Sequence, residues 1–411
     1  MPRIKPFRGI RPDSKFATRV VLEIETLSIE SAKVIREENP YSYVNMLVPK
    51  LENRYLRGSK RELAYKKINE NFEEFIDKGI LILDSAPSLY IYQIKHKNII
   101  QTGIWAVTSI DDYLNNTVKK HELTRADREN SLIDYLQQTG VDANPVLITY
   151  LPVPTIDSII ESNLKHTPAL NFYTLNAEHS LWKIDSEVEI NGLLKAFAEL
   201  PASYIADGHH RAAAASLLGI ERRRSNLKHT GHEEYNFFNS VFMATDQLQI
   251  LEFNRLIKTT AGLTNDAFIS ILSKNFTVSV SATAIKPRFL HEFGMYLNYK
   301  WYLLTALEHT YCSESPVADL DVTILQDFLL DPILQISDPR TDHRIAFIGG
   351  TTPVDQLATL VDSGEYEVAF TLFPTSIQQL IKVADAGEVM PPKSTWFEPK
   401  FQAGLVIHQI N

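Results

Sequence analysis

The chain has 411 residues, of which 44% are hydrophobic and 22% are charged, and its formal net charge is −9. This composition is ordinary for a globular protein and excludes a mainly disordered chain, a fibre and a coiled coil. The acidic balance gives no general attraction for a polyanion such as DNA. A single cysteine cannot form an internal disulfide, the N-terminus lacks the apolar stretch of a secretory signal, and no apolar run approaches the roughly 20 residues of a membrane span. We therefore expect a cytoplasmic protein whose partner is neither a membrane nor a nucleic acid.

Helical and strand-like patterns alternate along the chain, and no internal repeat interrupts them. Apolar residues at helical spacing predict helices over residues 28–38, 61–78 and 125–139. Runs rich in Tyr, Ile and Val predict strands over residues 88–94, 102–109 and 145–150, and a final strand over residues 404–410. Two hairpins are also predicted, one from residues 237–245 and 248–254 and one that turns at Asn298 and Tyr299. The mixture predicts an α/β (α+β) fold with a mixed sheet, divided into a larger part over residues 1–260 and a smaller C-terminal α/β part over residues 261–411.

The most informative segment is the sequence DGHHR, residues 207–211, where the apolar end of a strand meets an alanine-rich run. Alanine is the best helix former, so a helix begins at once, and the positive end of its dipole with its unpaired first amides binds phosphate or carboxylate readily. Gly208 permits close approach of the backbone, and His209, His210 and Arg211 add donors that suit phosphoryl oxygens. Asp207, at the strand exit, is placed to hold Mg²⁺ or to take a proton from an attacking hydroxyl.

Two other interpretations of this turn were weighed against the phosphate site. Asp207 would simply cap the helix while the two histidines pack as polar residues, or the histidines would ligate zinc. Neighbouring side chains on a tight turn rarely point at one ion, and no third His or Cys stands at ligand spacing. Four polar residues and a glycine in a row at a helix start favour the functional interpretation.

A second motif, HELT at residues 121–124, precedes the third predicted helix. Thr124 is placed to cap that helix. Helical geometry extended back by one turn would put Glu122, Arg125 and Arg128 on one face. A carboxylate beside two guanidinium groups forms either an anion site with its own base or an ordinary surface ion-pair ladder, and both interpretations stay open.

The third motif, MPPKSTWFEPK at residues 390–400, is stiffened by three prolines. Lys393, Ser394 and Thr395 are placed to contact an anionic ligand. Equally, the segment would be a structural lid packed by Trp396 and Phe397.

Taken together and in this order, the motifs resemble bacterial proteins of the domain-of-unknown-function family 1015. The matching motifs are IKPFR (4–8), NPYS (39–42), HELT (121–124), HSLW (179–182), DGHHR (207–211) and MPPKSTWFEPK (390–400). The DGHHR turn is also similar to that of free-serine kinases in the ParB-like superfamily. The resemblance implies a ParB-like core in the larger part and phosphoryl transfer to or from free L-serine, with Mg²⁺ as cofactor and ADP, ATP or pyrophosphate as phosphate carrier. It further implies a small phosphorylated metabolite as partner and is compatible with a homodimer.

Residue chemistry and the resemblance together assign the following roles. Catalytic roles fall to Asp207, which would also hold the metal, and to Glu122 and His210. Phosphate contacts are expected from Gly208, His209, Arg211, Arg125 and Lys393. Substrate contacts are expected from Glu25, Thr124, Ser394 and Thr395.

The chain departs from the family pattern at three places. Residues 22–25 read LEIE where the family has Pro-Pro-Tyr-Asp, which keeps a carboxylate at Glu25. Ser131 and Leu132 stand where an Asp-Arg pair is expected, and residues 253–255 read FNR in place of Thr-His-Arg. Two alternative functions therefore stand beside the kinase: a phosphoserine phosphatase, and a non-catalytic nucleotide-binding or DNA-associated ParB-like regulator.

Overall fold

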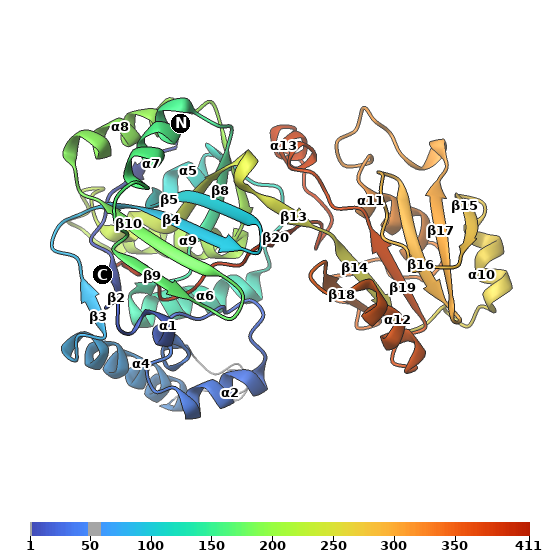
Figure 1. The fold of residues 1–411 in the computed structure, drawn as a ribbon, viewed down its shortest axis with the longest axis horizontal. Coiled ribbons are helices and arrows are strands. Elements are labelled where there is room, and N and C mark those ends of the chain that lie inside the picture. The colour runs from blue at the N-terminus through green and yellow to red at the C-terminus, as the bar shows by residue number, and fades with distance from the viewer. Residues whose placement is uncertain (1, 48–58) are drawn as a thin grey trace. The chain divides into compact units, whose positions relative to one another are not determined.

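The computed structural model describes residues 2–47 and 59–411, which divide into two compact units (Figure 1). The first unit comprises Met1–Lys119, Thr124–Leu248 and Pro399–Asn411, and the second comprises Lys120–Leu123 and Gln249–Glu398. By this division the chain passes into the second unit for residues 120–123 and again after Leu248, and its last residues return to the first unit. We keep the proposal of a ParB-like domain for the first unit with this extent.

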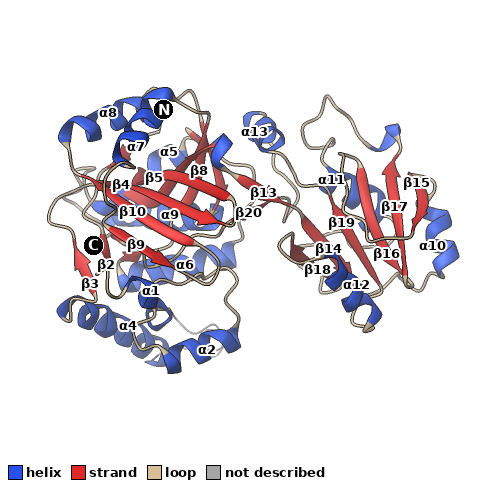
Figure 2. Ribbon diagram, in the orientation of Figure 1, coloured by secondary structure: helices blue, strands red, loops and turns tan. Residues whose placement is uncertain are grey.

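The first unit interleaves helices and strands (Figure 2). Its strands are β1 (Ile4–Lys5), β2 (Ile10–Pro12), β3 (Leu81–Leu83), β4 (Leu89–His96), β5 (Ile99–Ser109), β6 (Val118–Lys119), β7 (Val141–Asp142), β8 (Val146–Tyr150), β9 (Leu170–Tyr173), β10 (Glu178–Ile184), β11 (Ser203–Asp207), β12 (Phe237–Ala244) and β21 (His408–Gln409). Its helices are α1 (Ala17–Val20), α2 (Ile29–Glu38), α4 (Ser59–Asp77), α5 (Ile110–Leu114), α6 (Ala126–Thr139), α7 (Pro154–Asn163), α8 (Glu187–Ala198) and α9 (His209–Ser225), with 3-10 turns η1 (Tyr43–Met46), η2 (Glu234–Asn236) and η3 (Thr245–Gln247).

A nine-stranded sheet organises this unit, in the order β6-β11-β8-β12-β5-β4-β10-β9 with β1 paired to β5. β12 runs parallel to β8 and antiparallel to β5, so the sheet is mixed. The predicted α/β class with a mixed sheet is therefore confirmed.

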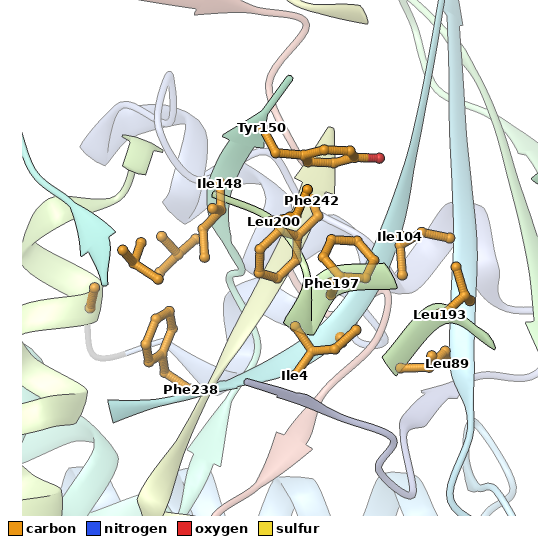
Figure 3. Packing of buried hydrophobic residues seen from close by; sticks show 14 of the residues in the cluster. Ile4, Leu89, Ile104, Ile148, Tyr150, Leu193, Phe197, Leu200, Phe238 and Phe242 are labelled. Atoms are coloured by element: carbon orange, nitrogen blue, oxygen red, sulfur yellow. The ribbon is translucent and has the colours of Figure 1, made fainter. Parts of the chain in front are cut away.

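One face of this sheet carries an extensive hydrophobic core (Figure 3). Side chains alternate across a strand, so Phe238 and Phe242 of β12 face the same side as Ile104 of β5 and Ile148 of β8. Phe197 of α8 packs edge-on against Phe242 at a ring-centroid distance of 4.8 Å. Ala212 and Ala215 of α9 join the same cluster, because their small side chains let this helix lie close to the sheet.

The second unit contains a six-stranded antiparallel sheet in the order β15-β17-β16-β19-β14-β18 (Figure 2). Its strands are β13 (Gln249–Leu251), β14 (Phe253–Ile257), β15 (Phe276–Ser281), β16 (Glu292–Leu297), β17 (Lys300–Ala306), β18 (Ile345–Gly349), β19 (Val368–Leu372) and β20 (Trp396–Glu398). Its helices are α10 (Asn265–Leu272), α11 (Asp321–Leu325), α12 (Val354–Asp362) and α13 (Ile377–Asp385), with the short turns η4 (Glu308–Thr310) and η5 (Gln326–Leu330). Leu357 of α12 packs against Leu256 and Tyr296 of the sheet.

Most predicted elements are confirmed. The helices expected at residues 28–38, 61–78 and 125–139 correspond to α2, α4 and α6, and the strands expected at residues 88–94, 102–109 and 145–150 correspond to β4, β5 and β8. The hairpin of β16 and β17 turns at Asn298 and Tyr299, whose φ angles of 47° and 61° suit a tight two-residue turn. Across the described parts of the chain, no helix is both long enough and apolar enough to cross a membrane.

Two strand predictions are wrong. The expected hairpin of residues 237–245 and 248–254 does not form, because β12 pairs with β5 on one edge and β8 on the other and has no edge left for the next strand. β13 pairs instead with β20, and β14 lies between β18 and β19. The final strand expected over residues 404–410 is reduced to the two residues of β21, which pair with β7.

Candidate functional site

The DGHHR segment forms the predicted strand–turn–helix. β11 ends at Asp207, Gly208 takes a left-handed conformation with φ of 97°, and the 17-residue helix α9 begins at His209. The carbonyl of Gly208 accepts the amides of Arg211 and Ala212, which starts the helix without a side-chain cap. The prediction of a glycine turn into a helix is confirmed, and the alternative in which Asp207 caps this helix is wrong.

Arg211 folds back over the turn and joins two carboxylates. Its Nη2 atom donates to Asp207 Oδ2 at 2.8 Å and to Glu25 Oε1 at 3.3 Å. A Cβ atom at position 208 would lie 2.8 Å from the Nε and Nη2 atoms of Arg211, so glycine is required there for the guanidinium to reach the carboxylates.

A second cation completes this carboxylate–cation cluster, by which we mean Glu25, Asp207, Arg211 and Lys400. The Nζ atom of Lys400 lies 2.8 Å from Glu25 Oε2. Two backbone hydrogen bonds between Leu22 and residue 403, at 3.1 and 2.8 Å, bring the segment that carries Glu25 beside the segment that carries Lys400. The cations are the more buried members, with 9% of Lys400 and 16% of Arg211 exposed against 30% of Glu25 and 35% of Asp207. A ligand therefore meets two carboxylates that are held from behind by two positive charges.

The two carboxyl groups have opposite pKa shifts. Burial, together with the charge of Asp207, raises the pKa of Glu25, and the attraction of Arg211 and Lys400 does not cancel this. Burial acts to raise the pKa of Asp207 as well, but Lys400 and Arg211 outweigh it and hold the pKa well below its usual range. Burial lowers the pKa of Lys400, but the charges of Asp207 and Glu25 more than compensate and raise it above its usual value. The cluster therefore contains one firmly ionised carboxylate and one carboxylate of increased basicity.

His209 and His210 both interact with other residues of the protein at this site. His209 is buried and its charge, when present, helps to lower the pKa of Asp207. The Nε2 atom of His210 accepts the backbone amide of Arg125 at 3.1 Å, which joins the DGHHR turn to the start of α6. Because Nε2 is the acceptor, the neutral ring of His210 carries its proton on Nδ1.

The start of α6 differs from the prediction. Its N-cap is Arg125 rather than Thr124, and the guanidinium of Arg125 forms a bidentate pair with Asp127 at 3.1 and 2.8 Å. Residues 121–125 are not helical, so Glu122 does not stack with Arg125 and Arg128 on a helical face. The prediction of a shared helical face is wrong, because the amide of Arg125 donates a hydrogen bond to His210 and the helix begins only at Ala126.

Four predicted site residues, Glu122, Lys393, Ser394 and Thr395, belong to the second unit. Ser394 is buried, and its hydroxyl donates to the carbonyl of Pro391 at 2.6 Å. The Lys393 ammonium lies 5.3 Å from the ring centroid of Phe253, and the Lys393 carbonyl accepts from Arg255 at 3.1 Å. These contacts are internal to the second unit and fit a packed segment, while the roles of the four residues toward a ligand stay predictions.

Two residues that the site prediction omitted take part in the first-unit site. Lys400 is the last residue of the MPPKSTWFEPK motif, directly after its last proline, and this place in the motif is the feature of the sequence that could have identified it as a site residue. Asp142 ends β7, and its pKa is raised to about 6 by burial, against the backbone hydrogen bond from Asn239. Only its strand-end position marks it in the sequence.

A cavity of about 350 Å³ opens beside Arg211 in the first unit. Its lining comes from α2 and the segment before it, from the region of η1, from α4 and α6, and from the chain around β7. The lining residues are Ile24, Leu27, Ser28, Ile29, Ala32, Lys33, Arg36, Tyr43, Val44, Leu47, Tyr65, Ser131, Leu132, Tyr135, Leu136, Val141, Asp142, Ala143, Asn144 and Arg211. Ser131 and Leu132, two of the positions that depart from the family pattern, are thus part of this cavity.

In the described residues, no three His, Cys, Asp or Glu side chains are grouped so that they could hold a metal ion. A magnesium ion does not require such a group, because it is commonly held by one or two carboxylates together with substrate phosphates and water. The carboxylates of Asp207 and Glu25 supply a donor set of that kind.

Comparisons with known proteins give similar structures but no curated relative, since no curated protein matches the chain. A free serine kinase mutant in complex with AMP is similar with a TM-score of 0.39 and 14% identity, over 74% of this chain and 90% of that chain. A free serine kinase mutant in complex with ADP gives a TM-score of 0.37 and 13% identity, over 73% of this chain and 88% of that chain. SbnI with a C-terminal truncation, from Staphylococcus aureus, gives a TM-score of 0.39 and 11% identity, over 73% of this chain and 85% of that chain.

The family comparison covers most of the chain. A family model described as "Protein of unknown function (DUF1015)" matches residues 4–323. The resemblance drawn from the sequence motifs is confirmed, and the chain belongs to this family.

Proposed function

We propose that the chain transfers a phosphoryl group between a phosphate carrier and the hydroxyl group of a small hydroxy amino acid such as L-serine. The observation that carries the proposal is the carboxylate–cation cluster at the start of α9, where Arg211 joins Asp207 and Glu25. Phosphoryl transfer needs little covalent chemistry from the protein. It needs positive charge beside the transferred group, an oriented hydroxyl and a base.

Each member of the cluster has a role in this reaction. The substrate oxygen attacks the phosphorus, and its proton passes to a carboxylate oxygen of Glu25, whose pKa is raised by burial and by Asp207. The bond from phosphorus to the donor oxygen breaks, and its electron pair leaves with the donor. Arg211 and Lys400 offset the negative charge on the transferred phosphoryl oxygens, and Gly208 leaves room for the guanidinium of Arg211.

Magnesium suits the same residues. Asp207 stays ionised because Lys400 and Arg211 overcome the effect of burial on its pKa, so its carboxylate is available as a metal ligand over the whole physiological range. When bound, the ion would neutralise charge on the donor phosphates. The donor in this proposal is a nucleotide or pyrophosphate, as the resemblance of the DGHHR turn to that of free-serine kinases implies.

The test is phosphoserine formation by the full chain with L-serine, Mg²⁺ and either ATP, ADP or pyrophosphate, followed by chromatography of the product. We expect Asp207→Asn to abolish product formation while the chain still folds. Asp185→Asn is the matched control, because Asp185 is an exposed carboxylate whose ion pair, at 3.5 Å, is with Lys183, and it should leave the rate unchanged.

Full activity of the Asp207→Asn variant would refute the assignment. Release of phosphate from phosphoserine without any acceptor would instead support the phosphatase alternative. A salt-sensitive shift of duplex DNA without turnover would support the regulator.

A further inference from the structure

The cavity beside Arg211 is much larger and more apolar than serine requires. Ten of its lining residues are aliphatic or alanine, and the ring of Tyr43 adds further apolar surface. The ten are Ile24, Leu27, Ile29, Ala32, Val44, Leu47, Leu132, Leu136, Val141 and Ala143. Its volume of about 350 Å³ falls within the range of roughly 300–1,000 Å³ that is typical of small-molecule pockets. Bare serine offers no apolar group to contact these walls.

Most polar groups of the lining are already engaged by the protein. The hydroxyl groups of Tyr43 and Tyr135 lie 3.1 Å apart, and Tyr135 donates onward to the carbonyl of Met46 at 3.0 Å. Arg36 donates to the carbonyls of Val44 and Leu47 at 3.1 and 3.4 Å. A nucleoside would place many polar atoms against this lining and leave several without partners, which is costly. An aliphatic or aromatic group has no hydrogen-bonding atoms that this lining would leave without partners.

The charges of the lining specify the other end of the ligand. Three cations, Lys33, Arg36 and Arg211, line the cavity against one carboxylate, Asp142. Arg211 is also the residue that joins the two carboxylates of the proposed reaction centre. Arg211 thus links the cavity to the proposed reaction centre, so a ligand seated in the cavity has its reacting end at Arg211 and its apolar end against the aliphatic side chains of α2 and α6.

We propose that the preferred substrate is a β-hydroxy-α-amino acid with an apolar or aromatic substituent on its β-carbon, or the phosphate ester of such a compound. The hydroxyl group lies at the carboxylate–cation cluster and the substituent fills the cavity. This inference rests on the proposed phosphoryl transfer, because that reaction places the hydroxyl. Leu132 is the specificity residue that we single out, since it is an aliphatic residue of α6 in the cavity wall.

The experiment measures binding to the full chain without a phosphate donor, by titration calorimetry with Mg²⁺ present. The ligands are L-serine, L-threonine, L-β-hydroxynorvaline and L-threo-phenylserine, which share the reacting hydroxyl and differ in apolar size. Each buried methylene should tighten binding about fourfold, so phenylserine should bind at least about tenfold more tightly than serine. Equal affinities across the series would overturn the inference.

Leu132→Asp should reduce the preference for phenylserine over serine to below about threefold. Leu63→Asp is the matched control, because Leu63 is an exposed leucine of α4 outside the cavity, and it should keep the full preference. Should Leu132→Asp not fold, Leu132→Phe serves the same purpose: it narrows the cavity, and phenylserine should then lose more affinity than serine. A preference that survives both substitutions in folded protein would overturn the inference.

Two further results separate this inference from the proposed function. If serine is phosphorylated but the four ligands bind with equal affinity, the apolar substrate class is refuted and the proposed phosphotransferase activity is not. The graded binding series without phosphoryl transfer from any donor would refute the phosphotransferase and leave the apolar site. A loss of affinity for AMP in Leu132→Asp would show that the cavity holds a nucleotide base, and would overturn the inference.

Discussion

Replacing Glu25 by glutamine separates the catalytic use of its charge from any structural use. The amide keeps the shape of the side chain and an oxygen for Arg211 and Lys400, but it cannot accept the substrate proton. General-base catalysis contributes about 10²- to 10⁴-fold to a rate, so Glu25→Gln should lower kcat by that factor, which corresponds to about 2.7–5.4 kcal/mol of transition-state stabilisation.

Stability should respond differently, because the pKa of Glu25 is raised in the folded chain by burial and by Asp207. The folded chain then holds the Glu25 proton more tightly than the unfolded chain does, so the contribution of this group to stability is present at low pH and lost as pH rises through the folded pKa. At pH 8 the charge of Glu25 opposes folding. Glu25→Gln should therefore keep the melting temperature of the wild type or raise it.

Asp207→Asn provides the contrast. Its pKa is lowered because Lys400 and Arg211 outweigh burial, so its contribution to stability is present above the unfolded pKa and is lost as pH falls through the folded pKa. Asp207→Asn should lower the melting temperature at pH 8. The assay is calorimetric unfolding at pH 8 beside initial rates of phosphoserine formation. A Glu25→Gln variant that melts well below the wild type, or that retains full kcat, would refute this reasoning.

Three further predictions concern the same unit. Gly208→Ala should lower the free energy of unfolding by about 1–2 kcal/mol because of the positive φ at this position, and it should abolish activity because the new Cβ displaces Arg211. Gly231→Ala is the control, since Gly231 has a φ of 91° and a Cβ there would meet nothing within 4 Å. This variant should lose stability in urea unfolding but keep its activity. Lys400→Met should destabilise the chain by about 3 kcal/mol in urea unfolding and shift the acid limb of the pH–rate profile upward, because the carboxylates lose a buried cation; an unshifted limb would contradict it. Burial lowers the pKa of His179 to about 4, so its stabilising contribution is present above its unfolded pKa of about 6.5 and is lost as pH falls through about 4. His179→Gln should flatten the dependence of the unfolding free energy on pH in that window, and an unchanged slope would speak against the assignment.

The local elements of the site could be predicted from the sequence because their causes lie within a few residues. A strand end, one glycine and four consecutive alanines after Arg211 are sufficient to predict a left-handed turn and a helix. The same holds for α2, whose Ser28 side chain accepts the amide of Ser31 as an N-cap. Glu25 entered the prediction through the family pattern rather than through local signals.

Strand pairing was predicted less well, because it depends on edges that distant segments supply. The sequence around Asp246 and Gln247 resembles a hairpin turn, but β5 and β8 already occupy both edges of β12. The start of α6 shows the same effect on a smaller scale. Thr124 has the chemistry of a cap, yet His210 binds the amide of Arg125 and the helix begins one residue later than a Thr124 cap would give.

Motif order and local backbone preferences are sufficient to predict the family, the α/β class and the strand–glycine–helix turn that carries Asp207 and Arg211. The carboxylate–cation cluster forms only when the chain folds. Glu25, Asp207 and Lys400 come from widely separated parts of the chain, and the backbone hydrogen bonds between Leu22 and residue 403 bring the first and last of these segments together. The opposite pKa shifts of Glu25 and Asp207 arise from that shared burial and from the two cations behind them, and burial of this kind exists only in the folded chain.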